Sequence, residues 1–462
     1  MSARDDTITA IATARGQAAL AILRVSGPEA IGIANRCFRG ADLSAVDSHT
    51  AHVGYVVDID GEDIDQVVAT VFRAPRSATG EDVVEISCHG GDLAPQLIQQ
   101  SLLDHGARLA DPGEFTQRAF LNGKMDLAQA EAVADLIHAS STKAHRVSLS
   151  HLQGRYSEQL EDLREELLEL AAFVELELDF SEEDVEFADR ERLEKLLRTS
   201  ENLLSELLAS YRTGELIRDG VRVVIGGRPN AGKSTLLNAL VGRDRAIVSP
   251  TPGTTRDEIE AEAEIDGLRY RFVDTAGLRD TSDAIEAEGV RRAEASIAHS
   301  DVLLYVYDIT EGLDADEEAF LQELGEEHPT LPVVRIANKR DLVDGERPSA
   351  GLNGQAVVIS AEEGQRDADA VAPVVMALRD AVADGLEDTD ASHVVMNQRH
   401  RQHLKEALEA VQRARRALAS GAAGDMLSLD LRSALHELGA ITGEITNEDV
   451  LDQIFSRFCI GK

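Results

Sequence analysis

Hydrophobic positions in the first 122 residues form short runs separated by glycine, proline and polar residues. The clearest runs are residues 19–25 (ALAILRV), 66–72 (QVVATVF) and 82–86 (DVVEI). Short runs of this kind, rich in β-branched residues and bounded by turn residues, are typical of β-strands. They predict a small α+β domain over residues 1–122.

From residue 125 to residue 212 the apolar residues recur every three or four positions, and charged residues fill the positions between them. This is the pattern of amphipathic helices that bury one face. Residues 396–462 return to the same pattern. Neither stretch is large enough for a comfortable core by itself, so we expect one discontinuous helical bundle built from residues 123–215 and 386–462.

The chain between these helical stretches, residues 216–385, alternates strand and helix patterns. Its β-rich runs are residues 221–225, 270–273, 302–307, 333–336 and 356–359. Strands that alternate with helices predict a mostly parallel sheet with helices on both faces. We expect this α/β domain to be inserted into the helical one, with residues 384–392 (DGLEDTDAS) as a polar linker. The predicted fold class is therefore multidomain, α/β plus all-α.

Length and composition exclude several classes of protein. A chain of 462 residues suggests about three domains at roughly 150 residues each, and 43% hydrophobic residues are enough for ordinary cores. No apolar run approaches the ~20 residues of a membrane span, and the polar N-terminus has no signal-peptide pattern. Cys37, Cys88 and Cys459 lie far apart without a CxxC pair. We expect a soluble cytoplasmic protein that does not contact membranes.

The charge balance is strongly acidic. Asp and Glu total 84 and Lys and Arg total 46, which gives a net charge of −38, and only seven of the basic residues are lysines. One interpretation is a protein that binds cations or basic partners. We favour the other, a surface adapted to a high-salt cytoplasm where self-repulsion is screened, because the acids are spread along the whole chain. The charge argues against a non-specific nucleic-acid binder.

Residues 227–234 carry the strongest motif, GRPNAGKS. It follows the strand pattern VRVVIG and precedes a helical pattern that begins at Thr235. This is the strand–loop–helix context of a P-loop, whose backbone N–H groups surround phosphate while the helix N-terminus adds positive potential. We expect Lys233 to meet the β- and γ-phosphates and Ser234 to hold Mg²⁺.

Three more motifs follow in order, each at the end of a predicted strand. They are Asp274-Thr-Ala-Gly277, Asn338-Lys339-Arg340-Asp341 and Ser360-Ala361. An acid after a strand can hold magnesium through water, and a glycine N–H can sense the γ-phosphate. The Asp341 carboxylate can accept from N1–H and N2–H₂ of guanine, a donor pair that adenine lacks. The set resembles a Ras-like GTPase domain, with its ligand at strand C-termini.

One position departs from the Ras pattern. Leu278 stands where Ras-type enzymes have a water-orienting glutamine, so hydrolysis must use another group. Glu286 in the following acidic segment is one candidate. Asn230 is another, because with the Thr-rich residues 249–257 it can hold a monovalent cation where an arginine finger would stand. From spacing alone, Asn230 could equally well brace the loop.

The motifs outside the G domain identify a family. ILRVSG at 22–27, TGEDVVE at 79–85, CHGG at 88–91, PGEFTQRAFLNGKMDLAQAEAV at 112–133 and CIGK at 459–462 resemble the MnmE (TrmE) family over essentially the whole chain. The resemblance implies an N-terminal folate-binding and dimerising domain, a helical domain and an inserted G domain. It implies a GTPase that adds a carboxymethylaminomethyl or aminomethyl group to carbon 5 of the wobble uridine (U34) of certain tRNAs.

The resemblance also implies partners and cofactors. The family works as a homodimer, forms a heterotetramer with the FAD-dependent MnmG (GidA), and takes a one-carbon unit from a tetrahydrofolate derivative, 5-formyl- or 5,10-methylene-tetrahydrofolate. Its G domains pair in a K⁺-dependent way. The alternative function, favoured by relatives in the same GTPase branch, is a switch in ribosome or complex assembly. Such a protein would be expected to carry a basic RNA-binding module, which is absent from this sequence.

The family's functional residues carry over onto matching positions of this chain. Folate contacts fall on Arg24, Glu85, Lys124 and Lys462; K⁺ ligands on Asn230, Ser249, Thr251 and Thr254; Mg²⁺ on Ser234 and Thr255; and the catalytic acid on Glu286. The GTP-binding set is Asn230, Ala231, Gly232, Lys233, Ser234, Thr235, Ser249, Thr251, Thr254, Thr255, Asp274, Thr275, Ala276, Gly277, Asn338, Lys339, Asp341, Ser360 and Ala361.

Two further observations bear on function. Four of the seven lysines, at 124, 233, 339 and 462, stand in these motifs, where a compact ammonium cannot be replaced by the planar fork of arginine. Cys459 near a uridine invites a nucleophilic role. A buried or structural thiol is the alternative for Cys459. We expect Cys37 and Cys88 to be structural.

Overall fold

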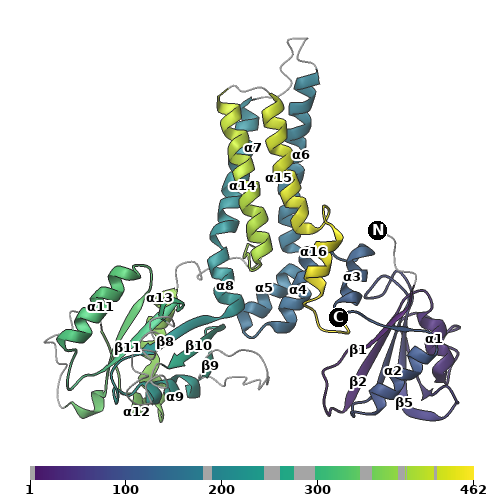
Figure 1. Cartoon of the computed structure of the whole chain (residues 1–462), viewed down its shortest axis with the longest axis horizontal. Coiled ribbons are helices and arrows are strands. Elements are labelled where there is room, and N and C mark those ends of the chain that lie inside the picture. Colours follow the sequence, from purple (N-terminus) through teal and green to yellow (C-terminus); the bar gives the residue numbers. More distant parts are fainter. Residues whose placement is uncertain are drawn as a thin grey trace, which may run out of the picture. The chain divides into compact units, whose positions relative to one another are not determined.

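The computed structural model describes residues 6–179, 190–243, 261–274, 297–343, 356–382, 391, 393–420 and 424–462 (Figure 1). These residues form two compact units. The first takes in the described parts of Met1–Ile137, His151–Leu197 and Glu409–Lys462, and the second those of His138–Ser150 and Arg198–Leu408. Among the described helices, none is both long enough and apolar enough to cross a membrane.

The first unit contains a seven-stranded sheet in the order β3-β4-β5-β6-β2-β1-β7. The strands are β1 (Ile8–Ile11), β2 (Leu20–Ser26), β3 (Phe38–Arg39), β4 (Thr50–Val57), β5 (Asp63–Phe72), β6 (Val83–His89) and β7 (Arg108–Leu109). Neighbouring strands are antiparallel except β1 and β7. Helices α1 (Ala30–Cys37) and α2 (Ala94–Asp104) contact each other and the sheet, so they share one face. Leu23, Ile33 and Ile98 meet in the core between them.

Helices make up the rest of the first unit. They include α3 (Glu114–Leu121), α4 (Leu127–His138), α6 (Arg155–Asp179), α15 (Gly424–Thr442) and α16 (Glu448–Phe455). Leu160, Leu163, Leu167 and Leu170 of α6 are all buried, and α6 packs along α15. The predicted amphipathic helices are thus confirmed here. Helices α7 (Arg190–Ala209) and α14 (Gln398–Ala419) each have residues in both units.

The second unit contains a six-stranded sheet in the order β13-β12-β11-β8-β10-β9. The strands are β8 (Val221–Gly226), β9 (Ala261–Ile265), β10 (Leu268–Asp274), β11 (Val302–Asp308), β12 (Val333–Asn338) and β13 (Ala356–Val358). Neighbours are parallel except for the β9–β10 pair. Helices α5 (Thr142–Leu152) and α8 (Tyr211–Asp219) also contribute residues to this unit.

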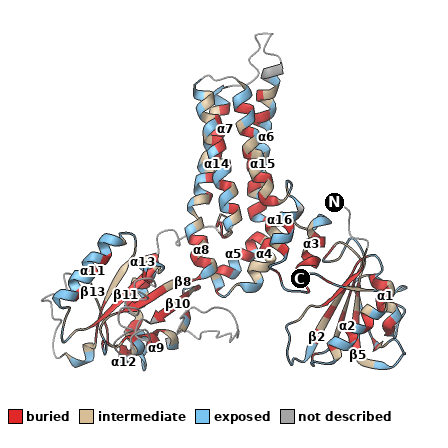
Figure 2. Cartoon of the chain, in the orientation of Figure 1, coloured by how far each residue is buried: buried red, intermediate tan, exposed pale blue. Residues whose placement is uncertain are grey.

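Helices cover both faces of this second sheet. Alternate residues of β8 belong to different cores: Val223 packs with Leu236 of α9 (Lys233–Arg243) and Leu378 of α13 (Ala372–Val382), whereas Val224 packs with Leu324 of α11 (Ala315–Glu327). Figure 2 shows β8 and β11 in the colour of buried residues along nearly their whole length. The predicted parallel sheet with helices on both faces is confirmed. Its strands' C-terminal ends form the edge where the sequence places the nucleotide motifs.

Candidate functional site

The loop between β8 and α9 has the geometry of a phosphate cradle. Gly227 has φ of +133°, and a Cβ there would lie 1.9 Å from the carbonyl oxygen of Val306. Gly232 has φ of +94°, and a Cβ there would lie 2.2 Å from the side-chain nitrogen of Asn338. Only glycine tolerates both the left-handed backbone and the close approach. These two glycines therefore set the shape of the loop.

Lys233 is folded back into this loop. Its side chain is buried, and Nζ donates hydrogen bonds of 2.9 Å each to the carbonyl oxygens of Gly227 and Arg228. The ammonium therefore lies at the loop itself, beside the first turn of α9, which carries Ser234 and Thr235. A helix start with a buried ammonium favours a phosphate. Asn230 is exposed and adopts φ of +64°, a conformation that asparagine accepts more readily than most residues.

Asn338 connects the P-loop to the loop after β13. It is 2% exposed; its Nδ2 donates to the Ala231 carbonyl at 2.8 Å, and its Oδ1 accepts from the Ala361 backbone N–H at 2.9 Å. The structure thus brings together three predicted site residues that are distant in sequence. Asn338 uses both ends of its amide for this link, so it shapes the site.

Asp341 and Lys339 lie at the same strand edge. The Ser360 hydroxyl donates to Asp341 Oδ1 at 2.6 Å, which fixes the orientation of the exposed carboxylate. Lys339 Nζ donates to Asp308 Oδ2 at 2.7 Å. Burial would raise the pKa of Asp308, but hydrogen bonds from Lys339 and Thr310 outweigh it and hold that pKa below its ordinary value. Asp308 is a site residue that the sequence motifs did not reveal.

Several predicted nucleotide and metal residues lie outside the described part of the chain. These are Ser249, Thr251, Thr254, Thr255, Thr275, Ala276, Gly277 and the predicted catalytic acid Glu286. Asp274 ends β10, directly beside Ile225 of β8 in the parallel pairing, so its backbone reaches the P-loop edge. Of the predicted metal ligands, Asn230 and Ser234 are described, and both stand at the phosphate loop, where oxygen donors suit Mg²⁺ or K⁺.

A second site gathers three of the four predicted folate residues. Arg24 of β2 and Glu85 of β6 are direct cross-strand partners, and Arg24 Nε and Nη2 both donate to Glu85 Oε1, at 3.0 and 2.7 Å. The guanidinium lies over the ring of Phe115, 5.6 Å from its centroid. The Phe115 backbone N–H donates to the Lys462 carbonyl at 3.1 Å. Phe115 therefore joins Arg24 to the C-terminus, which Figure 1 shows beside α3.

Lys124 belongs to the same region through the loop before β6. Its Nζ donates to the Pro75 carbonyl at 3.1 Å, and a Cβ on Gly80 would lie 3.3 Å from its Cγ. The flanking residues Thr79 and Glu81 both hydrogen-bond the Ser26 hydroxyl, two positions beyond Arg24 on the same strand face. A paired guanidinium and carboxylate with lysines nearby fit a ligand that has both ring donors and carboxylates, as a folate does.

Comparisons with known proteins identify the family of the chain. The family model "GTP-binding protein TrmE N-terminus" matches residues 7–124, and "MnmE helical domain" matches residues 127–459. A protein of Salinibacter ruber named tRNA modification GTPase MnmE is 69% identical over 99% of this chain and 100% of its own length. A protein of the same name from Cytophaga hutchinsonii is 43% identical over 99% and 98%. The chain belongs to the MnmE (TrmE) family.

A solved structure of Era with MgGDPNP and nucleotides 1506–1542 of 16S ribosomal RNA is similar over a smaller part of the chain. It is 30% identical, covering 34% of this chain and 56% of that one, with a TM-score of 0.26. The membership in the MnmE family rests on the full-length relatives.

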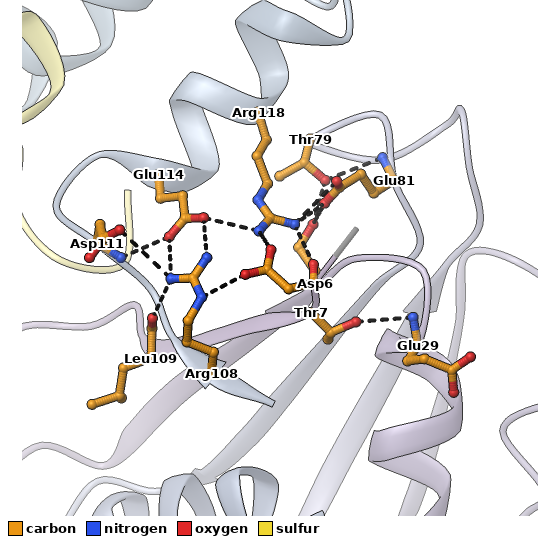
Figure 3. A network of polar contacts seen from close by, with 11 residues as sticks. Asp6, Thr7, Glu29, Thr79, Glu81, Arg108, Leu109, Asp111, Glu114 and Arg118 are labelled. Carbon is orange, nitrogen blue, oxygen red and sulfur yellow. Dashed lines mark hydrogen bonds and ion pairs between the residues drawn. The ribbon is translucent and has the colours of Figure 1, made fainter. Parts of the chain in front are cut away.

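This MnmE-family chain also has a buried ion cluster around Arg118, at α3, which the sequence motifs did not predict (Figure 3). Arg118 is 5% exposed and bonds Asp6, Glu81 and Glu114, while Arg108 bonds Asp6 and Glu114. Burial would raise the pKa of Glu114, but hydrogen bonds from Arg108, the Asp111 backbone and Arg118 outweigh it and lower that pKa. The cluster fixes the start of α3 and with it Phe115.

The three cysteines differ in environment. Burial raises the pKa of Cys37 and of Cys88 to about 11 for each thiol, as expected for structural cysteines. Cys459 is exposed. Its carbonyl accepts from the Lys462 backbone N–H at 3.3 Å, which forms the final turn of the chain. Cys459 is therefore not buried. Its nucleophilic role and the alternative of a structural thiol both stay predictions.

Proposed function

We propose that this chain is the GTP-hydrolysing component of a tRNA-modifying complex that adds a carboxymethylaminomethyl or aminomethyl group to carbon 5 of U34. Two full-length relatives are named tRNA modification GTPase MnmE, and one of them is 69% identical. The phosphate cradle at Gly227 and Lys233 supports nucleotide binding. The proposal includes the three-part organisation over residues 1–122, 123–215 with 386–462, and 216–385.

The observation that carries the nucleotide assignment is the linked arrangement of Asn338, Asp341 and Ser360 beside the P-loop. Asn338 ties the P-loop to the Ser360-Ala361 loop, and Ser360 orients the Asp341 carboxylate. A carboxylate in this position accepts from both N1–H and N2–H₂ of guanine. Specificity for guanine over adenine follows, because adenine has no matching donor pair.

Each predicted ligand receives a role in this proposal. Ser234 and Thr255 would hold Mg²⁺, which neutralises charge on the β- and γ-phosphates. Asn230, Ser249, Thr251 and Thr254 would hold K⁺ and support pairing of two G domains. Glu286 would orient the attacking water in place of the missing glutamine. Lys233 would leave the two loop carbonyls and meet the phosphates.

The first unit would hold the one-carbon donor. Arg24 and Glu85 offer a fixed guanidinium and carboxylate for the pterin ring, and Lys124 and Lys462 offer ammonium groups for the carboxylates of a tetrahydrofolate derivative. In the same proposal the chain acts in the cytoplasm as a homodimer with MnmG and tRNA. The acidic surface means that tRNA is recognised through shape, base contacts and the partner, with few phosphate contacts.

Base recognition is tested by the substitution Asp341→Asn in the full chain. Each hydrogen bond to a charged group contributes about 1.5–3 kcal/mol, so GTP affinity should fall roughly 10- to 100-fold. Xanthine carries a carbonyl oxygen at C2 where guanine has an amino group, so the variant should gain XTP hydrolysis. Asp380→Asn, on the exposed side of α13, is the matched control. Unchanged GTP turnover in Asp341→Asn would contradict the guanine assignment.

A further inference from the structure

The side chain of Arg228, the second residue of the P-loop, is directed to the start of α11. It forms ion pairs with Asp314 and with Glu317, whose Oε2 lies 3.1 Å from Arg228 Nη2. Glu317 is 8% exposed at its side chain, whereas Arg228 is 37% exposed. No family motif discussed above gives this arginine a role. The pair links the phosphate loop to α11, which packs on the face of the sheet opposite to α9.

Glu317 is rigidly placed by three further hydrogen bonds. The Tyr305 hydroxyl donates to Oε1 at 2.9 Å, and the Asp314 backbone N–H donates to Oε2 at 3.0 Å. The Glu317 backbone N–H in turn donates to Asp314 Oδ1 at 2.8 Å, which completes a capping box at the N-terminus of α11. Because the carboxylate is buried and each of its oxygens accepts a hydrogen bond from a neighbouring group, it is a fixed anchor for Arg228.

The main chain of the same arginine holds the lysine of the site. The Arg228 carbonyl is one of the two oxygens that accept from Lys233 Nζ, each at 2.9 Å. The other belongs to Gly227, which lies so close to the Val306 backbone that it has no room for a side chain. Anchoring the Arg228 side chain therefore fixes residues 227–228, whose carbonyl oxygens hold Lys233 Nζ until it moves to the phosphates.

We propose that Arg228, anchored by Glu317, is a positioning residue that holds the P-loop in the shape that presents Lys233 to the nucleotide. The inference rests on the proposed GTPase function and deepens it. Arg228 acts through the loop backbone, and its guanidinium is engaged by the α11 carboxylates. The pair differs from the Asn338 tie, which holds the opposite end of the loop at Ala231.

The test is a double-mutant cycle in the full chain with Arg228→Met, Glu317→Gln and both together. The measured quantities are the GDP dissociation constant with Mg²⁺, and kcat and KM for GTP. Each single variant should weaken GDP binding about tenfold and raise KM for GTP, and the double variant should be no worse than the worse single one. Additive effects, or wild-type nucleotide affinity in the single variants, would overturn the proposal.

Two more variants separate positioning from general stability. Arg228→Lys keeps the charge but cannot span two carboxylates, so it should restore part of the lost affinity. Arg366→Met removes an exposed pair with Glu362 in the same unit and should leave GDP binding unchanged. If Arg228→Lys and Arg228→Met bind GDP equally, the charge is irrelevant and the proposal fails. If the wild-type chain itself neither binds GDP nor hydrolyses GTP, the proposed function fails first.

Discussion

At the scale of single residues, buried polar side chains shape both candidate sites through their hydrogen bonds and ion pairs to other protein groups. The side-chain amide of Asn338 donates to the Ala231 carbonyl and accepts from the Ala361 backbone N–H, so it links the two loops of the candidate nucleotide site. Glu114, 1% exposed, and Arg118, 5% exposed, form a buried ion pair in α3, the helix that carries Phe115 under Arg24. Buried charges persist only when they are paired and hydrogen-bonded. Their pairing therefore specifies where α3 begins.

Removing one member of this cluster should expose its energetic role. In Glu114→Gln, Arg108 and Arg118 lose a buried carboxylate partner. This loss should destabilise α3 by about 3 kcal/mol at pH 7. The folded-state pKa of Glu114 lies below its unfolded value, so its stabilisation is present above the unfolded pKa and is lost as the pH falls through the folded one. The difference between wild type and variant should shrink towards pH 3.

Hydrogen exchange of the α3 amides at several pH values measures this local stability. Glu362→Gln, at an exposed carboxylate, is the control and should change protection little. An equal loss of protection for Glu114→Gln at pH 7 and pH 3 would mean that packing, and not charge, carries the effect.

At the scale of elements, the hydrophobic pattern predicted the strands that are buried. The predicted runs 302–307 and 333–336 lie within β11 and β12, and 66–72 lies within β5. The pattern missed β4, Thr50–Val57, because Gly54 interrupts it and Val53 and Tyr55 face outward. It also missed β9, whose sequence AEAEI carries two glutamates. Strands with one exposed face give weak signals in a single sequence.

The site was predicted less evenly than the fold. Motif spacing identified Lys233, Asn338 and Asp341, because P-loop chemistry demands particular residues at particular strand ends. It did not identify Arg228, Asp308 or Phe115, since each acts through a contact with a residue distant in sequence. Side-chain partners of this kind depend on how the elements pack, which spacing along the chain does not encode.

The C-terminal turn is an element whose placement can be tested. Gly461 has φ of +97°, and a Cβ there would lie 2.6 Å from the Ile11 carbonyl oxygen. Gly461→Ala should therefore push the last turn away from β1 and break the hydrogen bond between the Phe115 N–H and the Lys462 carbonyl. Binding of 5-formyl-tetrahydrofolate should weaken about tenfold, as measured by calorimetry. Gly91→Ala, where a Cβ meets nothing within 4 Å, should bind the folate like the wild type. Equal affinity in both variants would exclude the tail from the site.

At the scale of the whole molecule, the charge of −38 sets the conditions in which the fold is stable. Self-repulsion among many carboxylates opposes compaction, and salt screens it: the Debye length falls from about 10 Å at 0.1 M to about 3 Å at 1 M. Interactions inside buried clusters such as that of Arg118 are screened much less. Added salt therefore weakens the repulsion more than it weakens these pairs.

The melting temperature of the chain should accordingly rise between about 0.1 and 1 M KCl. NaCl is the control, because general screening is the same for both salts, whereas a K⁺ site would add stability only in KCl with nucleotide present. Differential scanning calorimetry of the chain with and without GDP measures both effects. A melting temperature that falls with either salt would contradict the interpretation of the acidic surface.

The central claim, a GTPase that serves modification of the tRNA wobble uridine, is tested most directly by nucleoside mass spectrometry of tRNA from cells with and without this chain. We expect cells without it to lose the aminomethyl-type group at carbon 5, the intact chain to restore it, and Glu286→Ala to fail. Unchanged nucleosides in cells lacking the chain would contradict the account and leave a GTPase that acts as an assembly switch.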